Sequence, residues 1–190
     1  EGRSLEAHGE RDAAATVWRQ ILARRPQTAY AHYRLGWLAY QAGQWQEALA
    51  HHQRALAYAP GWYEPAWHAG TCCVQLRDYP NAHRYYQQAI AAQPDLAVLW
   101  YHAGRALKDD GQLDAAMPYY QQALALDPAS PDIHYSQGLL HLLRGEWALG
   151  WPGYEQRFAG SDRADKEHRP LTRLPRWQGE IGRASCRERV

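Results

Sequence analysis

Several residue types that mark particular classes of protein are scarce in this 190-residue chain. It has three cysteines, none in a spacing typical of a metal site, so neither a disulfide framework nor a zinc motif is expected. No apolar run is long enough to span a membrane, and no secretory signal peptide is visible. Phenylalanine occurs once, whereas tryptophan occurs nine times and tyrosine thirteen times. These features favour a globular cytoplasmic chain whose apolar surface is built from tryptophan and tyrosine.

Neither basic nor acidic residues are in clear excess. The formal net charge is +1, from 21 basic and 20 acidic residues. Residues 181–190 match, residue for residue, the translation of the adapter-like DNA sequence ATC GGA AGA GCG TCG TGT AGG GAA AGA GTG, and we interpret them as an artefact of sequencing. Without them the chain carries 18 basic and 19 acidic residues. No basic stripe or polybasic segment stands out, so neither a nucleic acid nor a membrane surface is an expected partner.

What the chain does contain is a repeat of 34 residues, visible in three kinds of landmark. A glycine recurs at Gly2, Gly36, Gly70, Gly104 and Gly138. A proline recurs at Pro26, Pro60, Pro94 and Pro128, and a small residue at Ala14, Ala48, Ala82 and Ala116. Because several landmarks recur in phase, the period predicts a stack of similar structural units.

Each unit reads as two short amphipathic helices. In residues 97–128, Trp100, Gly104 and Leu107 share one face of a first helix, Gly111 breaks it, and Pro128 ends a second helix. Other helices are predicted at 12–25, 29–42, 45–58, 63–76 and 79–92. Asp78 and Asp132 are expected to cap helices. The apolar face of a single hairpin is exposed to solvent unless neighbouring hairpins cover it.

The 34-residue period with these landmarks resembles the tetratricopeptide repeat family, from Gly2 to about Phe158. The resemblance implies an all-α, right-handed superhelical solenoid of helix hairpins that serves as a binding scaffold. We expect repeats at about 1–28, 29–62, 63–96, 97–130 and 131–158. Residues 159–180 are interpreted as a linker toward a further domain.

The family geometry also implies which side chains face the concave surface. Residues three places before the repeat glycine, and those one to two turns later, are expected there. They are Tyr33, Trp37, Tyr40, Trp67, Thr71, Tyr101, Arg105, Lys108 and Tyr135. A row of rings with a few hydrogen-bonding groups suits an extended peptide or a partner helix.

Two interpretations of this row remain open. The rings either bind a partner or only support neighbouring helices, since tyrosine is common at this place in the family. The family's best-known peptide site is a clamp of lysine and asparagine around a terminal carboxylate. The inner places of this chain hold rings and no asparagine, so that clamp is not expected.

Metal or catalytic chemistry is not predicted. His68 and His102 share a repeat place on neighbouring first helices, but no third ligand is evident. Cys72 and Cys73 are interpreted as buried thiols. Glu155 and Arg157, two residues apart on a helix, are expected to face different ways. No nucleophile–base pair or glycine-rich phosphate loop is present, so we expect no cofactor, no metal and no catalysis by this chain.

The end of the chain carries a second resemblance. The pattern Gly-Trp-Pro-x-Tyr-Glu-x-Arg, followed by Pro-x-Trp-x-Gly-Glu, is similar to the junction in bacterial proteins where these repeats lead into a heptosyltransferase-like glycosyltransferase domain. The matching residues are Gly150, Trp151, Tyr154, Glu155, Arg157, Pro175, Trp177, Gly179 and Glu180. Gln156 and Phe158 replace tryptophans often seen there. The resemblance implies an interaction module at the N-terminal side of such an enzyme, and a free-standing adaptor is the alternative.

Overall fold

A computed structural model describes residue 2 and residues 11–158 of the chain. Its helices are α2 (Arg11–Arg24), α3 (Ala29–Gln41), α4 (Trp45–Tyr58), α5 (Tyr63–Gln75), α6 (Tyr79–Ala92), α7 (Ala97–Asp109), α8 (Leu113–Leu126), α9 (Pro131–Leu143) and α10 (Trp147–Tyr154), followed by the 3₁₀ turn η1 (Glu155–Phe158). The predicted linker at 159–180, the tail at 181–190 and the first helix of the first repeat lie outside the described residues.

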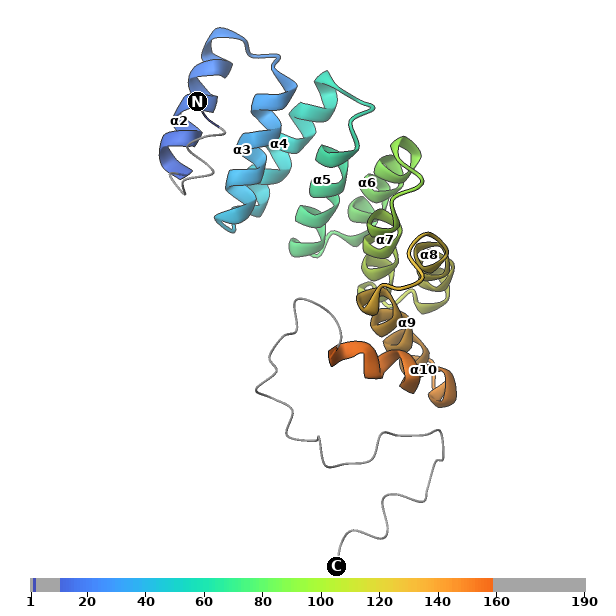
Figure 1. Ribbon diagram of the computed structural model, residues 1–190. Coiled ribbons are helices and arrows are strands. Elements are labelled where there is room, and N and C mark those ends of the chain that lie inside the picture. Colours follow the sequence, from blue (N-terminus) through green and yellow to red (C-terminus); the bar gives the residue numbers. More distant parts are fainter. Residues whose placement is uncertain (1, 3–10, 159–190) are drawn as a thin grey trace, which may run out of the picture.

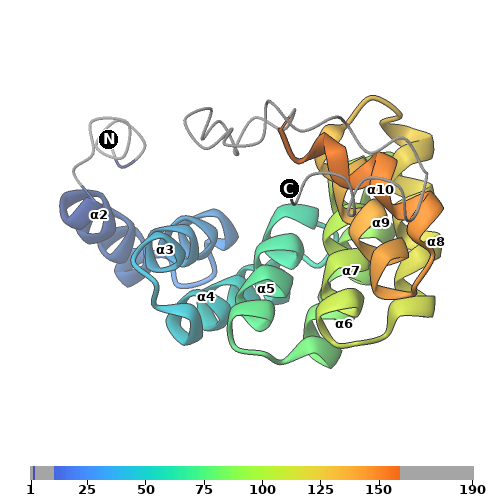
Figure 2. The same ribbon diagram turned by 90° about the horizontal axis from the view of Figure 1, so that it is seen from below.

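The helices form successive antiparallel pairs that follow one another along an arc (Figure 1). Each helix packs against the next one in the chain, and α3, α5, α7 and α9 also contact one another in order. Figure 2 shows these first helices along the inner side of the arc and α4, α6 and α8 along its outer side. Within residues 11–158 the chain is all-helical, which confirms the predicted solenoid of hairpins.

The helix boundaries follow the 34-residue period closely. The observed α3 and α5 end one residue before the predicted ends, and α4 and α6 have the predicted bounds. Asp78 caps α6 by accepting a hydrogen bond from the Asn81 backbone N–H, as expected. The prediction for Asp132 is wrong, because Pro131 starts α9 and the capping position falls on Ser130.

The turn inside each hairpin requires a left-handed backbone at one repeat place. Gly43, Gly111 and Gly145 take φ of 74°, 80° and 77° there. The same place in the third hairpin is held by Arg77, with φ of 59°. A side chain in this conformation costs roughly 1–2 kcal/mol relative to the right-handed one, so the remaining packing of that hairpin holds the turn.

The repeat glycine has a packing role that spans the hairpin. Each of these glycines lies against the ring or backbone of the residue sixteen places later, on the second helix. The pairs are Gly2 with Trp18, Gly36 with His52, Gly70 with Tyr86, Gly104 with Tyr120 and Gly138 with Tyr154. At four of these places an atom lies within 2.8 Å of where a Cβ would sit, so glycine is required there, whereas at Gly104 the nearest atom is 3.1 Å away. His52 is the one member of this set that is not tryptophan or tyrosine, and both of its ring nitrogens are buried without a hydrogen-bond partner.

In the last hairpin the two helices contact each other through backbone atoms at the repeat glycine. A Cβ on Gly138 would lie 2.6 Å from the Tyr154 backbone nitrogen and 2.7 Å from the Gly150 carbonyl oxygen. In the preceding hairpin, a Cβ on Gly104 would meet only side-chain atoms, at 3.1 Å or more. The glycine at position 150, where earlier repeats have alanine, therefore lets α9 and α10 approach backbone to backbone.

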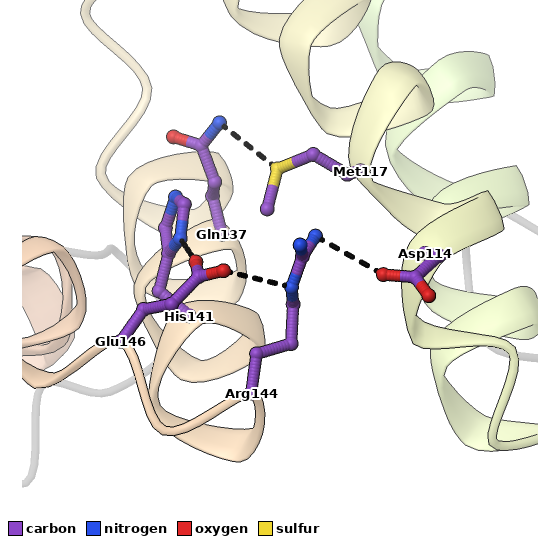
Figure 3. A network of polar contacts seen from close by, with 6 residues as sticks. All are labelled: Asp114, Met117, Gln137, His141, Arg144 and Glu146. Carbon is purple, nitrogen blue, oxygen red and sulfur yellow. Dashed lines mark hydrogen bonds and ion pairs between the residues drawn. The ribbon is translucent and has the colours of Figure 1, made fainter.

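A polar network ties this hairpin to the preceding one (Figure 3). The Arg144 Nε lies 3.1 Å from Glu146 Oε1, and an Arg144 terminal nitrogen lies 3.4 Å from Asp114 Oδ1 on α8. His141 pairs with the other oxygen of Glu146, which lowers the pKa of that carboxyl group. These pairs are at least partly exposed, so they contribute orientation more than stability.

Candidate functional site

The candidate site is the inner face of the arc, formed by the first helix of each pair (Figure 2). Seven rings from α3, α5 and α7 contact one another in a continuous series. We call them the ring ladder: Tyr33, Trp37, Tyr40, Trp67, His68, Tyr101 and His102.

The lower part of the ladder is centred on His68 of α5. Its ring centroid lies 5.8 Å from that of Tyr33, 5.0 Å from that of Trp37 and 6.3 Å from that of Tyr40. Trp37 and Tyr40 are stacked on each other at 5.7 Å. The His68 ring therefore connects the rings of α3 to those of α5.

The upper part repeats this arrangement one helix further along the arc. Trp67 stacks on His68 at 5.0 Å and contacts His102 of α7 at 5.5 Å. His102 in turn contacts Tyr101 at 5.2 Å. The Ser136 hydroxyl on α9 donates a hydrogen bond to the Tyr101 hydroxyl over 3.4 Å, so the contacts extend to a fourth helix.

Most of the sequence-predicted residues have partly exposed side chains in the structure. This holds for Tyr33, Trp37, Tyr40, Trp67, Tyr101, Arg105, Lys108 and Tyr135. Thr71 is different, because it is only 8% exposed. Its hydroxyl donates to the Trp67 carbonyl oxygen and accepts from the Tyr86 hydroxyl, which gives it a role within the packing.

The three other polar or terminal members of the predicted set are Arg105, Lys108 and Tyr135. The Arg105 guanidinium lies 5.9 Å from the centroid of the Tyr101 ring, within reach of a cation–π contact. Lys108 Nζ is 2.9 Å from Asp109 Oδ1, so its charge is largely neutralised locally. The Tyr135 ring packs on Tyr154 of α10 at 5.5 Å.

Burial keeps the ladder neutral near pH 7. It lowers the pKa of His68 to about 4 and that of His102 to about 3, with the charge of Arg105 adding to the effect on His102. Burial also raises the pKa of the Tyr33 hydroxyl to about 12, helped by Glu64. A neutral row of rings beside one guanidinium suits apolar and aromatic side chains of a partner rather than a highly charged one.

Sequence reasoning missed two ladder residues and one neighbour. The sequence pattern suggests His68 and His102 only as metal ligands, although each directly follows a predicted ring residue in the repeat. Trp62, which ends the turn before α5, packs on Tyr33 at 4.7 Å. The two histidines could have been found because they hold the same place in successive repeats. The repeat contains no comparable pattern at the place of Trp62.

Two other features of the described part of the chain bear on function. Cys72 and Cys73 are buried free thiols, as predicted, and burial raises their pKa to about 12 and about 11. No group of three or more potential metal-binding side chains is found within residues 11–158. Across the same residues, no helix combines the length and apolar character needed to cross a bilayer.

Comparison with solved structures shows the same fold in several proteins. MamA from Desulfovibrio magneticus RS-1 is 18% identical, with a TM-score of 0.75 over 88% of this chain and 93% of that one. TTC0263 from Thermus thermophilus is 24% identical, with a TM-score of 0.66 over 87% and 90%. YrrB, described as a TPR protein with an unusual peptide-binding site, is 19% identical, with a TM-score of 0.74 over 86% and 84%.

Comparison of sequences gives two family matches. No curated protein matches the chain. Residues 1–65 match a family model described as Tetratricopeptide repeat, and residues 104–145 match one described as TPR repeat. Together the two matches cover more than half of the 190 residues. Both matched stretches are therefore similar to the tetratricopeptide repeat family.

Proposed function

We propose that this chain is a protein-interaction module that binds an extended peptide or a partner helix across the ring ladder. The observation that carries the proposal is the continuity of the ladder, in which partly exposed rings from three successive helices contact one another. Large rings lose little conformational entropy on binding and dominate the energy of peptide interfaces. The peptide-binding site described for YrrB, a protein of the same fold, supports an interaction role.

The chemistry of the face indicates the kind of partner. The ladder is neutral near pH 7, and its main charge is the Arg105 guanidinium, which lies beside Tyr101. A segment with two or three apolar or aromatic side chains at regular spacing would bury them against these rings. The two buried free thiols suit a reducing compartment, and we place the module in the cytoplasm.

The test uses a peptide selected from a displayed random library on the wild-type chain. Replacing Tyr33, Trp67 and Tyr101 together with alanine should weaken binding of that peptide by about 100-fold or more, because several central rings are lost. Trp147→Ala is the matched control, since that ring is 49% exposed but lies on the last helix, away from the ladder. Binding is measured by calorimetry, and helicity by circular dichroism.

The result that would overturn the proposal is equal binding by the triple variant and the wild type. Should the triple variant lose helicity, the single replacement Trp37→Ala takes its place, because that ring is partly exposed and stacks mainly on Tyr40 and His68. Unchanged affinity in Trp37→Ala and reduced affinity in Trp147→Ala would move the binding site to the end of the array.

We further propose that the module serves a bacterial glycosyltransferase as its N-terminal part, with a free-standing adaptor as the alternative. This rests on the junction pattern at residues 150–157 and 175–180.

Five residues of the junction pattern lie in the described part of the chain. Arg157 lies 4.4 Å from the centroid of the Tyr154 ring and 3.2 Å from Glu155 Oε1. The expectation that Glu155 and Arg157 face apart is thus wrong, because the chain tightens into the 3₁₀ turn η1 there. A strand, glycine-rich turn and helix encoded after Glu180 would support the enzyme, and a stop codon would leave the adaptor.

A further inference from the structure

Two histidines of the second hairpin, His32 on α3 and His51 on α4, are brought together where the two helices pack. The Nδ1 atoms of His32 and His51 are 3.2 Å apart, and their ring centroids are separated by 5.5 Å. The ring ladder does not include either residue. Two ring nitrogens at this distance share one proton or one ion, because two lone pairs or two N–H groups would repel each other.

The proton positions on His32 follow from a feature of the repeat. His32 Nε2 lies 3.1 Å from the Pro26 carbonyl oxygen. The equivalent residue of the fourth hairpin, Trp100, contacts the equivalent Pro94 carbonyl through its indole N–H, which can only donate. In the fifth hairpin, His134 Nε2 makes the same contact with the Pro128 carbonyl. His32 therefore carries its proton on Nε2, and its Nδ1 presents a lone pair toward His51.

We propose that His32 and His51 together bind one divalent ion of the zinc class, Zn²⁺, Ni²⁺ or Cu²⁺, through their two Nδ1 atoms. The ion takes the place of the proton that otherwise lies between them. Nitrogen ligands of zinc lie about 2.1 Å from it, so two ligands of one tetrahedral ion are roughly 3.4 Å apart. The observed 3.2 Å is close to this spacing, and small ring rotations would suffice.

The Pro26 carbonyl contact is also what a metal-binding histidine requires. Such a histidine typically donates its other ring N–H to a backbone carbonyl, which fixes the tautomer and orients the lone pair. Imidazole nitrogens favour zinc, nickel and copper over magnesium and calcium. On binding, the Nδ1 proton of His51 is exchanged through water for one on Nε2, so both rings stay neutral and no net proton is released.

The surroundings leave room for the remaining ligands but limit the affinity. His32 is buried under the ring of Tyr58, whereas His51 is partly exposed, so water reaches the site from the His51 side. Burial lowers the pKa of both histidines, which keeps them unprotonated and able to bind an ion at neutral pH. The positive charges of Arg54 and Arg19 oppose a cation, whereas the negative charge of Glu47 favours one. With two protein ligands and water in the other positions, we expect a dissociation constant in the micromolar range.

The test is a titration of the full chain, without an affinity tag, with Zn²⁺ alone in a non-chelating buffer at about pH 7.5, where both rings are neutral. The wild type should bind one ion per chain by calorimetry, and Mg²⁺ should not compete. His51→Gln and His32→Gln should each weaken binding by at least tenfold. His134→Gln is the matched control, because His134 holds the same repeat place and the same carbonyl contact, but Gly153 stands where His51 would be.

Two results would overturn the proposal. One is the absence of stoichiometric Zn²⁺ binding by the wild type at millimolar concentration. The other is equal Zn²⁺ affinity in the wild type and in all three variants, which would show that other histidines bind the ion. A variant that fails to fold is replaced by a direct reading on the wild type: the ring ¹⁵N signals of His32 and His51 should shift together on addition of Zn²⁺, and those of His134 should not.

Discussion

Gly138→Ala should release the last helix, α10, from the solenoid and destabilise the fifth hairpin by about 3 kcal/mol, at the upper end of what overpacking costs. The added methyl group would stand 2.6 Å from the Tyr154 backbone nitrogen and 2.7 Å from the Gly150 carbonyl oxygen. Backbone atoms cannot change rotamer, so the two helices must move apart. Because repeat arrays are held by nearest-neighbour contacts, the loss should stay at this end.

Gly104→Ala is the matched control for this effect. It places the methyl group at the same point of the fourth hairpin, where the nearest atoms are side-chain atoms of Tyr119 and Tyr120 at 3.1–3.3 Å. Alanine also favours helix over glycine by up to about 1 kcal/mol, which offsets the crowding. Hydrogen exchange of α10 amides should accelerate in Gly138→Ala and stay unchanged in Gly104→Ala. Similar exchange in both variants would contradict the backbone contact.

Acidification should unfold the array through its buried histidines. His68 and His102 have folded-state pKa values of about 4 and about 3, lowered from 6.5 mainly by burial. Below pH 6.5 the unfolded chain takes up these protons and the folded chain does not. Their stabilising contribution is therefore complete above pH 6.5 and is lost as the pH falls toward the folded-state values of about 4 and about 3. Each histidine contributes a slope of about 1.4 kcal/mol per pH unit in this window.

The two histidines together should remove roughly 4 kcal/mol between about pH 7 and about pH 5, which is a large part of the stability of a typical domain. His102→Phe keeps a ring in the ladder and removes one titrating group, together with an Nδ1 atom that lacks a hydrogen-bond partner. We expect urea unfolding of this variant to show a pH-dependent loss that is smaller than that of the wild type by about 2 kcal/mol, the share of one histidine. A pH dependence identical to that of the wild type would show that His102 is not the neutral group described above.

The helices could be predicted from the sequence because the 34-residue period places the same breakers at the same points. Pro26, Gly43 and Asp78 act through local backbone chemistry, and local chemistry is readable along the chain. Aspartate is a good capping residue, which favours a cap at Asp132, but Pro131 is the first residue of α9 and the cap falls on Ser130. The prediction failed because two local preferences compete for the start of this helix, and the preference of proline for the first helical position prevails.

The contacts between helices could be predicted only in part. The period shows which residues share a place, so Tyr33, Trp67 and Tyr101 could be grouped on one face. It does not show the register between two helices of a hairpin. The sixteen-residue spacing of Gly104 and Tyr120, and the meeting of His32 with His51, both depend on that register, and neither was predicted.

The most direct test of the interaction role follows the tryptophan indole N–H signals in an ¹⁵N–¹H spectrum while the selected peptide is added. Trp37 and Trp67 belong to the ring ladder. Trp100 is held by a hydrogen bond to the Pro94 carbonyl oxygen, and Trp147 lies exposed on α10. A peptide bound across the inner face should shift or broaden the signals of Trp37 and Trp67 and leave those of Trp100 and Trp147 in place. Shifts confined to Trp100 or Trp147 would contradict binding on the ladder.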